Sequence, residues 1–274
     1  VKDIVFGYEV IDSYNVLNKI SAFSDFSEDI VIPTMEECAK FSEEVLAPIN
    51  AIGDQQGATI KDGVVTMPEE FVDAYKKFAE AGWASISLPS DIGGGGMPIT
   101  LSGGTLEILS TANLAFGLAP GLSAGAISAI NFHGNQEQKD KFLPKLVSGE
   151  WTGTMNLSEP QSGSDLGTIT TKAEPQEDGS YKITGTKVWI TFGEHNMTEN
   201  IIHLVLAKVP GSPEGTKGIS MFIVPKYIVN DDGSIGDSNN VSCISIEEKL
   251  GIHASPTCVM EYDGSVGYLV GEEN

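Results

Sequence analysis

Two short segments in the second half of the chain bring together residue types that can bind a planar, phosphate-bearing ligand. Residues 155–165 read MNLSEPQSGSD, a run with turn-forming Pro160 and Gly163 and with several hydroxyl groups. Residues 189–191 supply one large aromatic side chain and a further hydroxyl. Main-chain donors can bind carbonyl oxygens, hydroxyls can bind phosphate, and an indole can pack against a flat ring. The combination predicts a flavin site in this half of the chain.

Trp189 is the residue on which this interpretation depends most. Taken alone, a tryptophan in a strand lies more often in a hydrophobic core than against a cofactor, and Ser158 and Thr191 would be ordinary hydroxyls at strand ends. The joint spacing of the two segments favours the cofactor. The glycine run at residues 93–96 also suggests a nucleotide loop, but it lacks the G-x-G-x-x-G order. We expect it to be a loop that borders the substrate pocket.

The charge of the chain limits the classes of partner. Among 274 residues, 38 are acidic and 16 are basic, and the formal net charge is −22. Such a field repels nucleic acid and anionic lipid, so neither is an expected partner. All of the basic residues are lysines. A phosphate must therefore be held by backbone N–H groups, hydroxyls, lysine point charges or groups from elsewhere, because no arginine fork is present.

Cysteine, histidine and hydropathy patterns argue against several other classes. Cys38, Cys243 and Cys258 form no C-x-x-C pattern, which predicts reduced, buried thiols of a cytosolic-type compartment. The histidines have no cysteine partners and no H-E-x-x-H spacing, so no metal site is expected. No G-x-S-x-G elbow of an α/β-hydrolase is present. No apolar run reaches the roughly 18 residues of a membrane span, and the first residue, Val1, leaves open a segment before it.

The first half of the chain is expected to be helical. Apolar residues recur at helical spacing from Pro33 until Pro48, which should end that helix, and again from Pro68 to Gly82. Three more helices are expected within residues 100–119, 122–132 and 135–146.

From about Trp151 the pattern changes to short strands. Residues 181–190 alternate between apolar and polar, and further strand-length apolar runs lie at 201–209, 219–224 and 258–262. We therefore predict an α+β chain, with a helical domain at residues 1–150 and a small β-barrel domain at residues 151–274.

Several motifs, in order along the chain, resemble the acyl-CoA dehydrogenase family. They are ISLPSDIGGGGMP, NFHGNQEQKDKFLPKLVSGEW, MNLSEPQSGSDLGTITTKAE, ITGTKVWIT and EEKLGIHASPT. The resemblance covers residues 27–274 and looks closest to the family's larger, 3-methylmercaptopropionyl-CoA dehydrogenase-like members. It implies a helical N-terminal domain, a middle β-domain that contacts FAD, and a C-terminal four-helix domain that is absent from this chain.

The resemblance also implies roles for single residues. The family's flavin-contacting positions fall on Met155, Leu157, Ser158, Trp189, Ile190 and Thr191, and Ser164 falls on a position that contacts the acyl-CoA or the cofactor phosphates. Met155 stands where many members carry an aromatic residue, and His253 stands where arginine is frequent. The family's catalytic carboxylate lies in the third domain, so no catalytic residue is assigned here and a fragment of a longer polypeptide is expected.

The implied reaction is FAD-dependent α,β-dehydrogenation of an acyl-CoA thioester to the 2-enoyl-CoA, with an electron-transfer flavoprotein as electron acceptor. Two alternatives stay open. One is an acyl-CoA oxidase that is reoxidised by oxygen, and the other is a flavin-containing, DNA-protective relative, which the negative charge disfavours. The resemblance further implies a homo-oligomer, a dimer or tetramer, in the cytoplasm or, in a eukaryote, in the mitochondrial matrix.

Overall fold

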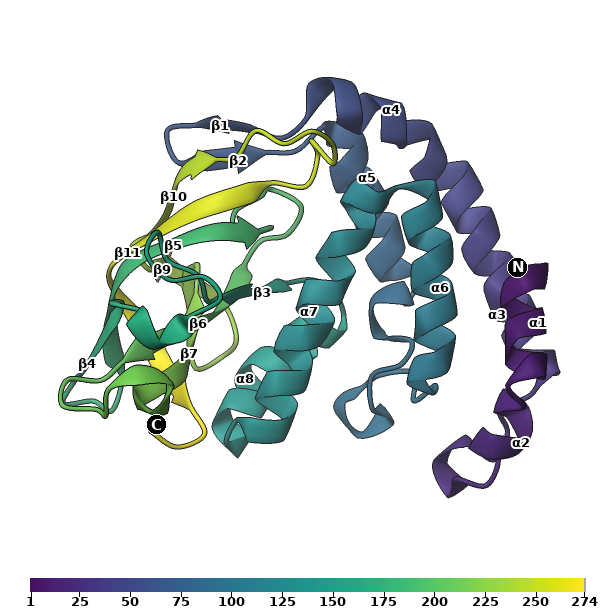
Figure 1. Ribbon diagram of the computed structural model, residues 1–274, viewed down its shortest axis with the longest axis horizontal. Coiled ribbons are helices and arrows are strands. Elements are labelled where there is room, and N and C mark those ends of the chain that lie inside the picture. Colours follow the sequence, from purple (N-terminus) through teal and green to yellow (C-terminus); the bar gives the residue numbers. More distant parts are fainter. Residues whose placement is uncertain (274) are drawn as a thin grey trace.

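Helices and strands occupy separate halves of the molecule, with the helices on the right of Figure 1 and most strands on the left. The computed structural model describes residues 1–273. The helices are α1 (Lys2–Val10), α2 (Ser13–Leu17), α3 (Glu28–Phe41), α4 (Ala47–Gln56), α5 (Glu69–Glu80), α6 (Ile99–Ala112), α7 (Leu114–His133) and α8 (Gln136–Val147). They alternate with loops and short 3₁₀ turns. The predicted α+β class is confirmed.

Three helix boundaries differ from the sequence prediction, and in each place a proline is tolerated. Helix α3 begins at Glu28 and contains Pro33, where the prediction began the helix. Pro48 does not end its helix, because a π-helical turn at Ser42–Leu46 leads directly into α4 and places Pro48 in the first turn. The π-helical turn changes the hydrogen-bond register just before Pro48, so the helix continues although Pro48 has no N–H to donate. The break between α6 and α7 falls at Asn113, whose side chain caps α7 by accepting the Phe116 N–H at 3.1 Å. Helix α7 then continues through Pro120.

The main sheet forms a closed barrel. Its strands are β3 (Thr152–Asn156), β4 (Lys172–Pro175), β5 (Tyr181–Thr191), β6 (Ile201–Lys208), β7 (Ile219–Pro225), β10 (Val241–Ile246) and β11 (Thr257–Val270). Strand β7 pairs with both β6 and β11, which closes the ring β11–β5–β4–β6–β7, and β3 and β10 extend it. Residues such as Ala173, Ile183 and Phe222 fill the interior. The predicted β-barrel is therefore confirmed.

Two small hairpins complete the strand inventory. Strands β8 (Tyr227–Val229) and β9 (Ile235–Ser238) form one, and β1 (Thr59–Lys61) and β2 (Val64–Thr66) form the other. The β1–β2 hairpin belongs to the helical half in sequence, yet Val65 is fully buried in the core of the β half. The sequence analysis did not expect this hairpin.

Helix α7 connects the two halves through direct packing on β3. The Gly153 N–H donates to Ser123 Oγ at 3.1 Å, and a Cβ at Gly153 would lie 2.4 Å from the Ala126 Cβ, so only glycine fits. The segment after β5 makes a second connection, because Phe192 and Met197 belong to the core of the helical half. Strands β3 and β5 are thus fixed against the helices.

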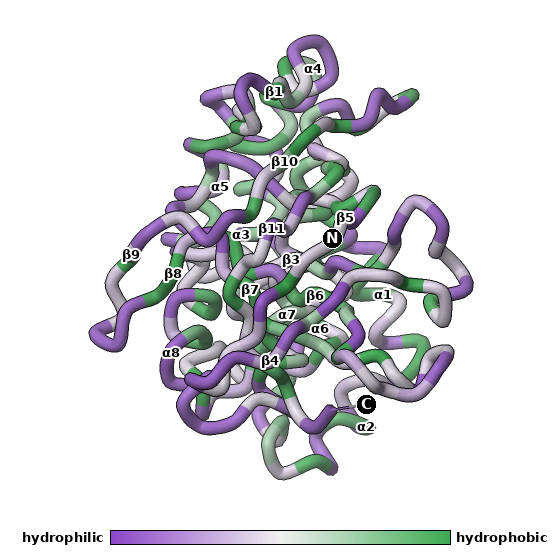
Figure 2. The backbone as a smooth tube through the Cα atoms, turned by 90° about the vertical axis from the view of Figure 1, so that its left-hand side faces the viewer, coloured by the Kyte–Doolittle hydropathy of each residue, from purple (hydrophilic) through white to green (hydrophobic). Residues whose placement is uncertain are grey.

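By length and hydropathy alone, α7 could cross a membrane, and within residues 1–273 it is the one helix that passes this test. The sequence analysis expected no such segment; glycine and serine residues interrupt the apolar run of α7 without interrupting the helix. Core helices of globular proteins pass the same test. Figure 2 shows α6, α7 and strands β6 and β7 among the hydrophobic stretches in the middle of the molecule.

Candidate functional site

Trp189 lies on a β-bulge near the end of β5. On either side of the bulge, Lys187 pairs with Met260 and Ile190 pairs with Cys258. Strand β5 therefore has one more residue than β11 between these pairs. Trp189 has a φ of 59°, a left-handed conformation that costs a bulky residue about 1–2 kcal/mol. The result is an indole that is 57% exposed beside an Ile190 side chain that is only 3% exposed.

Strand β3 and the turn after it lie directly beside this end of β5. Thr154 Oγ1 donates to the Thr191 carbonyl at 2.8 Å, and the Val188 N–H donates to the Ser158 carbonyl at 2.9 Å. The side chains of Met155, Leu157, Ser158 and Thr191 are half-buried. The structure thus brings the two sequence segments together. Ile190 is the exception in orientation, because its side chain lies in the barrel core and only its backbone is available to a ligand.

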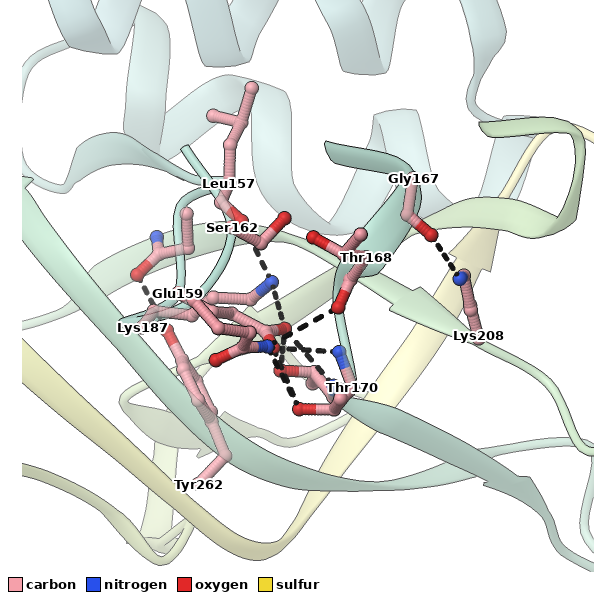
Figure 3. A network of polar contacts seen from close by, with 12 residues as sticks. Leu157, Glu159, Ser162, Gly167, Thr168, Thr170, Lys187, Lys208 and Tyr262 are labelled. Atoms are coloured by element: carbon pink, nitrogen blue, oxygen red, sulfur yellow. Dashed lines mark hydrogen bonds and ion pairs between the residues drawn. The ribbon is translucent and has the colours of Figure 1, made fainter. Parts of the chain in front are cut away.

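A buried ion pair organises the turn (Figure 3). Lys187 Nζ donates to Glu159 Oε1 and to the Leu157 carbonyl, both at 2.9 Å. The Lys187 side chain is 0% exposed and that of Glu159 is 2% exposed. The carboxylate accepts further hydrogen bonds from the backbone and hydroxyl groups of Thr170 and Thr171 and from the Gln161 amide. The two halves of the turn are therefore tied to one carboxylate.

These donors set the protonation state of Glu159. Burial by itself would raise the pKa of this carboxyl group, but the hydrogen bonds from Thr171 and Thr170 and the charge of Lys187 outweigh burial and lower the pKa to about 2. Glu159 is consequently ionised at neutral pH. Figure 3 shows the Leu157 side chain pointing away from this polar network.

Residues 162–167 of the turn are fixed by side-chain hydrogen bonds at both ends, while Gly163 and Ser164 between them are exposed to solvent. Ser162 Oγ donates to the Asp165 carbonyl at 2.6 Å, and Lys208 Nζ donates to the Gly167 carbonyl at 2.7 Å. Gly163 and Ser164 are exposed, and within residues 1–273 their N–H groups have no hydrogen-bond acceptor. Within residues 1–273, Ser164 makes no hydrogen bond to Trp189, Ile190 or Thr191 of β5. Exposed amides and hydroxyls on a fixed turn can bind an anion.

The helical half contains a separate apolar cavity of about 290 Å³ between α6, α7 and the segment before α6. Its walls include Trp83, Leu109, Gly121, Ala124 and Ile127. The glycine run at residues 93–96 folds back through backbone hydrogen bonds onto residues 85–89, several of which line the cavity. The cavity can accept an apolar chain.

His253, which stands where the resembled motif frequently has an arginine, lies in the loop before β11. Its Nδ1 is 2.7 Å from the Asp54 carbonyl oxygen, and its Nε2 is 2.9 Å from the Lys249 carbonyl oxygen. Both ring nitrogens face acceptors, so only the doubly protonated ring satisfies both. The Asp54 carbonyl, then the Lys249 carbonyl, raise the pKa of His253. Here His253 joins α4 to the loop before β11.

Sequence reasoning missed Thr154, Glu159 and Lys187 as the residues that hold the site. All three lie inside or next to the quoted motifs. The signal that could have found them is a lysine and a glutamate in segments whose neighbours are buried, since buried charges occur in pairs.

The fold and this site define a class of protein. A sequence profile described as "Acyl-CoA dehydrogenase, N-terminal domain" matches residues 33–150, and one described as "Acyl-CoA dehydrogenase, middle domain" matches residues 154–265. The chain belongs to the acyl-CoA dehydrogenase family.

Individual relatives sharpen this assignment. The chain is 46% identical to 3-methylmercaptopropionyl-CoA dehydrogenase of Ruegeria pomeroyi over 100% of this chain and 47% of the relative. It is 38% identical to a butyryl-CoA dehydrogenase of Syntrophomonas wolfei, over 99% of this chain and 46% of the relative. The predicted resemblance to the larger members is confirmed. The chain spans about half the length of these curated relatives.

Solved structures show the same fold. An acyl-CoA dehydrogenase from Bacillus anthracis, complexed with FAD, superimposes with a TM-score of 0.72 at 27% identity, over 91% of this chain and 38% of that one. Butyryl-CoA dehydrogenase from Megasphaera elsdenii gives a TM-score of 0.70 at 23% identity, over 91% of this chain and 60% of that one.

Proposed function

We propose that the protein to which this chain belongs catalyses FAD-dependent α,β-dehydrogenation of an acyl-CoA thioester to the 2-enoyl-CoA. The observation that carries the proposal is the exposed Trp189 indole, held on a bulge in a strained conformation beside the 155–165 turn. Strain of this kind persists where surrounding structure imposes it and is concentrated at ligand sites. The named activities of the relatives agree with the proposal.

The residues present fit FAD. The exposed indole of Trp189 offers a face to a flat ring, Thr191 offers a hydroxyl and an N–H group, and the turn offers the free N–H groups of Gly163 and Ser164. We propose Met155, Leu157, Ser158, Ile190 and Ser164 as the remaining cofactor contacts, with Ser164 also contacting the substrate. FAD, when bound, supplies the hydride acceptor.

The chain's own residues would act by positioning. Thr154 holds the Thr191 carbonyl, and the Glu159–Lys187 pair holds the turn, so the contact groups are fixed before a ligand arrives. The half-buried Met155 and Leu157 exclude water from the same surface. We propose the α6–α7 cavity for the acyl chain. No catalytic base is assigned in this chain, and we place the carboxylate that removes the α-proton outside it.

Further proposals concern the whole protein. We propose a division into a helical domain at residues 1–150 and a β-domain at residues 151–274, an electron-transfer flavoprotein as electron acceptor, and a homo-oligomeric assembly. A cytoplasmic location, or the mitochondrial matrix in a eukaryote, fits the bacterial and mitochondrial relatives.

The test is anaerobic titration of the flavin-loaded, full-length protein with acyl-CoA thioesters of increasing chain length. Bleaching of the oxidised flavin absorbance is the expected result, and persistent oxidised flavin across the series would refute the proposal. Readmitting oxygen then separates two activities. A reduced flavin that persists in oxygen but is reoxidised by added electron-transfer flavoprotein supports a dehydrogenase, and rapid reoxidation by oxygen with release of one peroxide per flavin identifies an oxidase. Salt-sensitive DNA binding by the same protein would point to the DNA-protective alternative.

A further inference from the structure

The Glu159–Lys187 pair contacts the proposed flavin-binding backbone directly. Lys187 Nζ donates to the carbonyl of Leu157, a proposed contact residue. The N–H of the next residue, Val188, donates to the carbonyl of Ser158, another proposed contact. Lys187 also directly precedes the bulge that presents Trp189. The Lys187 side chain and the Val188 backbone therefore join the turn to β5 directly before the bulge.

The carboxylate partner fixes the far side of the same turn. Glu159 accepts six hydrogen bonds, from Gln161, Thr170, Thr171 and Lys187. With this many donors it stays ionised, and the positive charge of Lys187 balances it within 2.9 Å. The pair is thus electrically neutral as a unit, and removing either partner leaves a net charge buried behind the site.

We propose that Glu159 and Lys187 are positioning residues of the flavin site, which hold its contact backbone and keep its rear electrically neutral. This inference rests on the proposed function. A merely structural pair would affect stability alone. A pair packed behind the flavin would also set the reduction potential of the bound flavin, because nearby charge tunes a cofactor's electronics and reduction adds negative charge to the ring.

The two single substitutions should therefore shift the potential in opposite directions. In Lys187→Met the remaining donors keep Glu159 ionised, and its unbalanced negative charge should lower the midpoint potential of the bound flavin. In Glu159→Gln the unbalanced ammonium of Lys187 should raise it at the acid end of the stable pH range, because burial lowers the pKa of Lys187 and this variant removes the carboxylate that raises that pKa. The double substitution K187M/E159Q restores neutrality and should return the potential toward that of the wild type. The loss of fixed geometry should weaken FAD binding about 10- to 100-fold in K187M, as for supporting residues of other cofactor sites.

The experiment measures FAD affinity and flavin midpoint potential of the full-length protein and these variants, with unfolding midpoints recorded beside them. The matched control is Lys226→Met, which breaks a second lysine–glutamate pair, Glu194–Lys226, whose carboxylate is buried. It should lower the unfolding midpoint without moving the potential. Lys187→Arg, which keeps the charge, should retain most of the FAD affinity.

Opposite shifts in the two single variants, with recovery in the double variant, support the inference. Shifts of the same sign, or an unchanged potential in both, overturn it and leave a purely structural pair. If K187M does not fold, E159Q decides alone, measured across the stable pH range: a potential raised at the acid end, where Lys187 is protonated, supports the inference, and a potential unchanged at every pH overturns it. A wild-type protein that neither binds FAD nor bleaches with acyl-CoA overturns the proposed function as well, so the two failures are distinguishable.

Discussion

The β half contains two lysine–glutamate pairs with buried carboxyl groups, and the pKa values of these two carboxyl groups shift in opposite directions. Glu159 and Glu194 are equally buried, at 2% and 3% exposure, and each lies within 2.9 Å of a lysine ammonium. The pKa of Glu159 is lowered to about 2, whereas burial raises the pKa of Glu194 despite the opposing charge of Lys226. The presence of a partner lysine therefore does not explain the difference.

The number of hydrogen-bond donors explains it. Glu159 accepts from six donors, while Glu194 has Lys226 Nζ at 2.5 Å and support from the His195 backbone. An ionised carboxylate with unfilled acceptor sites in a buried environment bears a desolvation cost that one lysine offsets incompletely. The donor-rich pair is also the one behind the proposed flavin turn, where a fixed geometry is useful.

The largest effect expected from this comparison is on stability. Glu159→Ala should lower the free energy of unfolding by about 3–5 kcal/mol, because it leaves a fully buried Lys187 without its counter-charge and several donors without an acceptor. Glu194→Ala should cost less, about 1–3 kcal/mol, because the Lys226 side chain is 18% exposed and can be hydrated. Denaturant unfolding of both variants measures this, and an equal or reversed order would contradict the donor-count explanation.

The pH dependence of stability should separate the two glutamates next. The Glu159 pKa falls from 4.5 to about 2 on folding, so its contribution is present above about pH 4.5 and is lost as the pH falls through 2. The Glu194 pKa is raised above 4.5, so its contribution is present below pH 4.5 and is lost as the pH rises through the raised value.

Unfolding free energies from pH 3 to pH 7 test these signs. Glu159→Gln should flatten the acid-side loss of stability, and Glu194→Gln should gain stability relative to the wild type as the pH rises. If the free energy of unfolding of Glu194→Gln falls further below that of the wild type toward pH 7, the ionised form of Glu194 is the stabilising one.

A smaller stability effect is expected at Trp189, where the structure stores strain instead of relieving it. Trp189→Gly should change the free energy of unfolding by no more than about 1 kcal/mol, because glycine adopts the 59° φ without strain and the indole is mostly exposed. FAD affinity should nevertheless fall about 10-fold through loss of the ring contact. Trp151→Ala is the contrasting control, since that indole is 1% exposed and its loss should cost about 3–5 kcal/mol. A strongly destabilised Trp189→Gly would mean that the indole is part of the core.

Local patterns predicted most of the architecture because they report burial and period. The change from helical to strand periodicity near Trp151 matches the step from α8 to β3. The hairpin β1–β2 was missed although Asp62 and Gly63, with φ values of 52° and 80°, form a turn that the sequence signals as D-G. The proline at position 48 misled the prediction, because its effect depends on where it falls in the helical turn.

The arrangement that holds the site depends on register between distant strands, which local sequence does not specify. Period-two alternation would place Lys187 and Trp189 on the same face of β5, yet the structure buries one and exposes the other. The bulge opposite Val259 causes this, and it arises from the pairing of β5 with β11. The motif letters predict ligand contacts, and the long-range pairing determines which polar residues support the predicted positions.

The smallest expected effect is on the pKa of His253, which contacts Asp54 at the protein surface. Unlike Glu159, both side chains of this contact are accessible to solvent. His253 is held by carbonyl oxygens of Asp54 and Lys249, with the Asp54 carboxylate at 3.2 Å and the Lys249 ammonium also acting on the ring. Its raised pKa means that the contact between α4 and the loop is complete below pH 6.5 and is lost as the pH rises through the raised value. An NMR titration of the His253 ring should therefore give a pKa above 6.5. Asp54→Asn should retain most of the shift, because the backbone carbonyls are the largest causes. A pKa that returns to 6.5 in this variant would assign the shift to the Asp54 carboxylate. The pKa of this surface group would then be set by a neighbouring charge, whereas the pKa values of the buried glutamates are set by the number of hydrogen-bond donors.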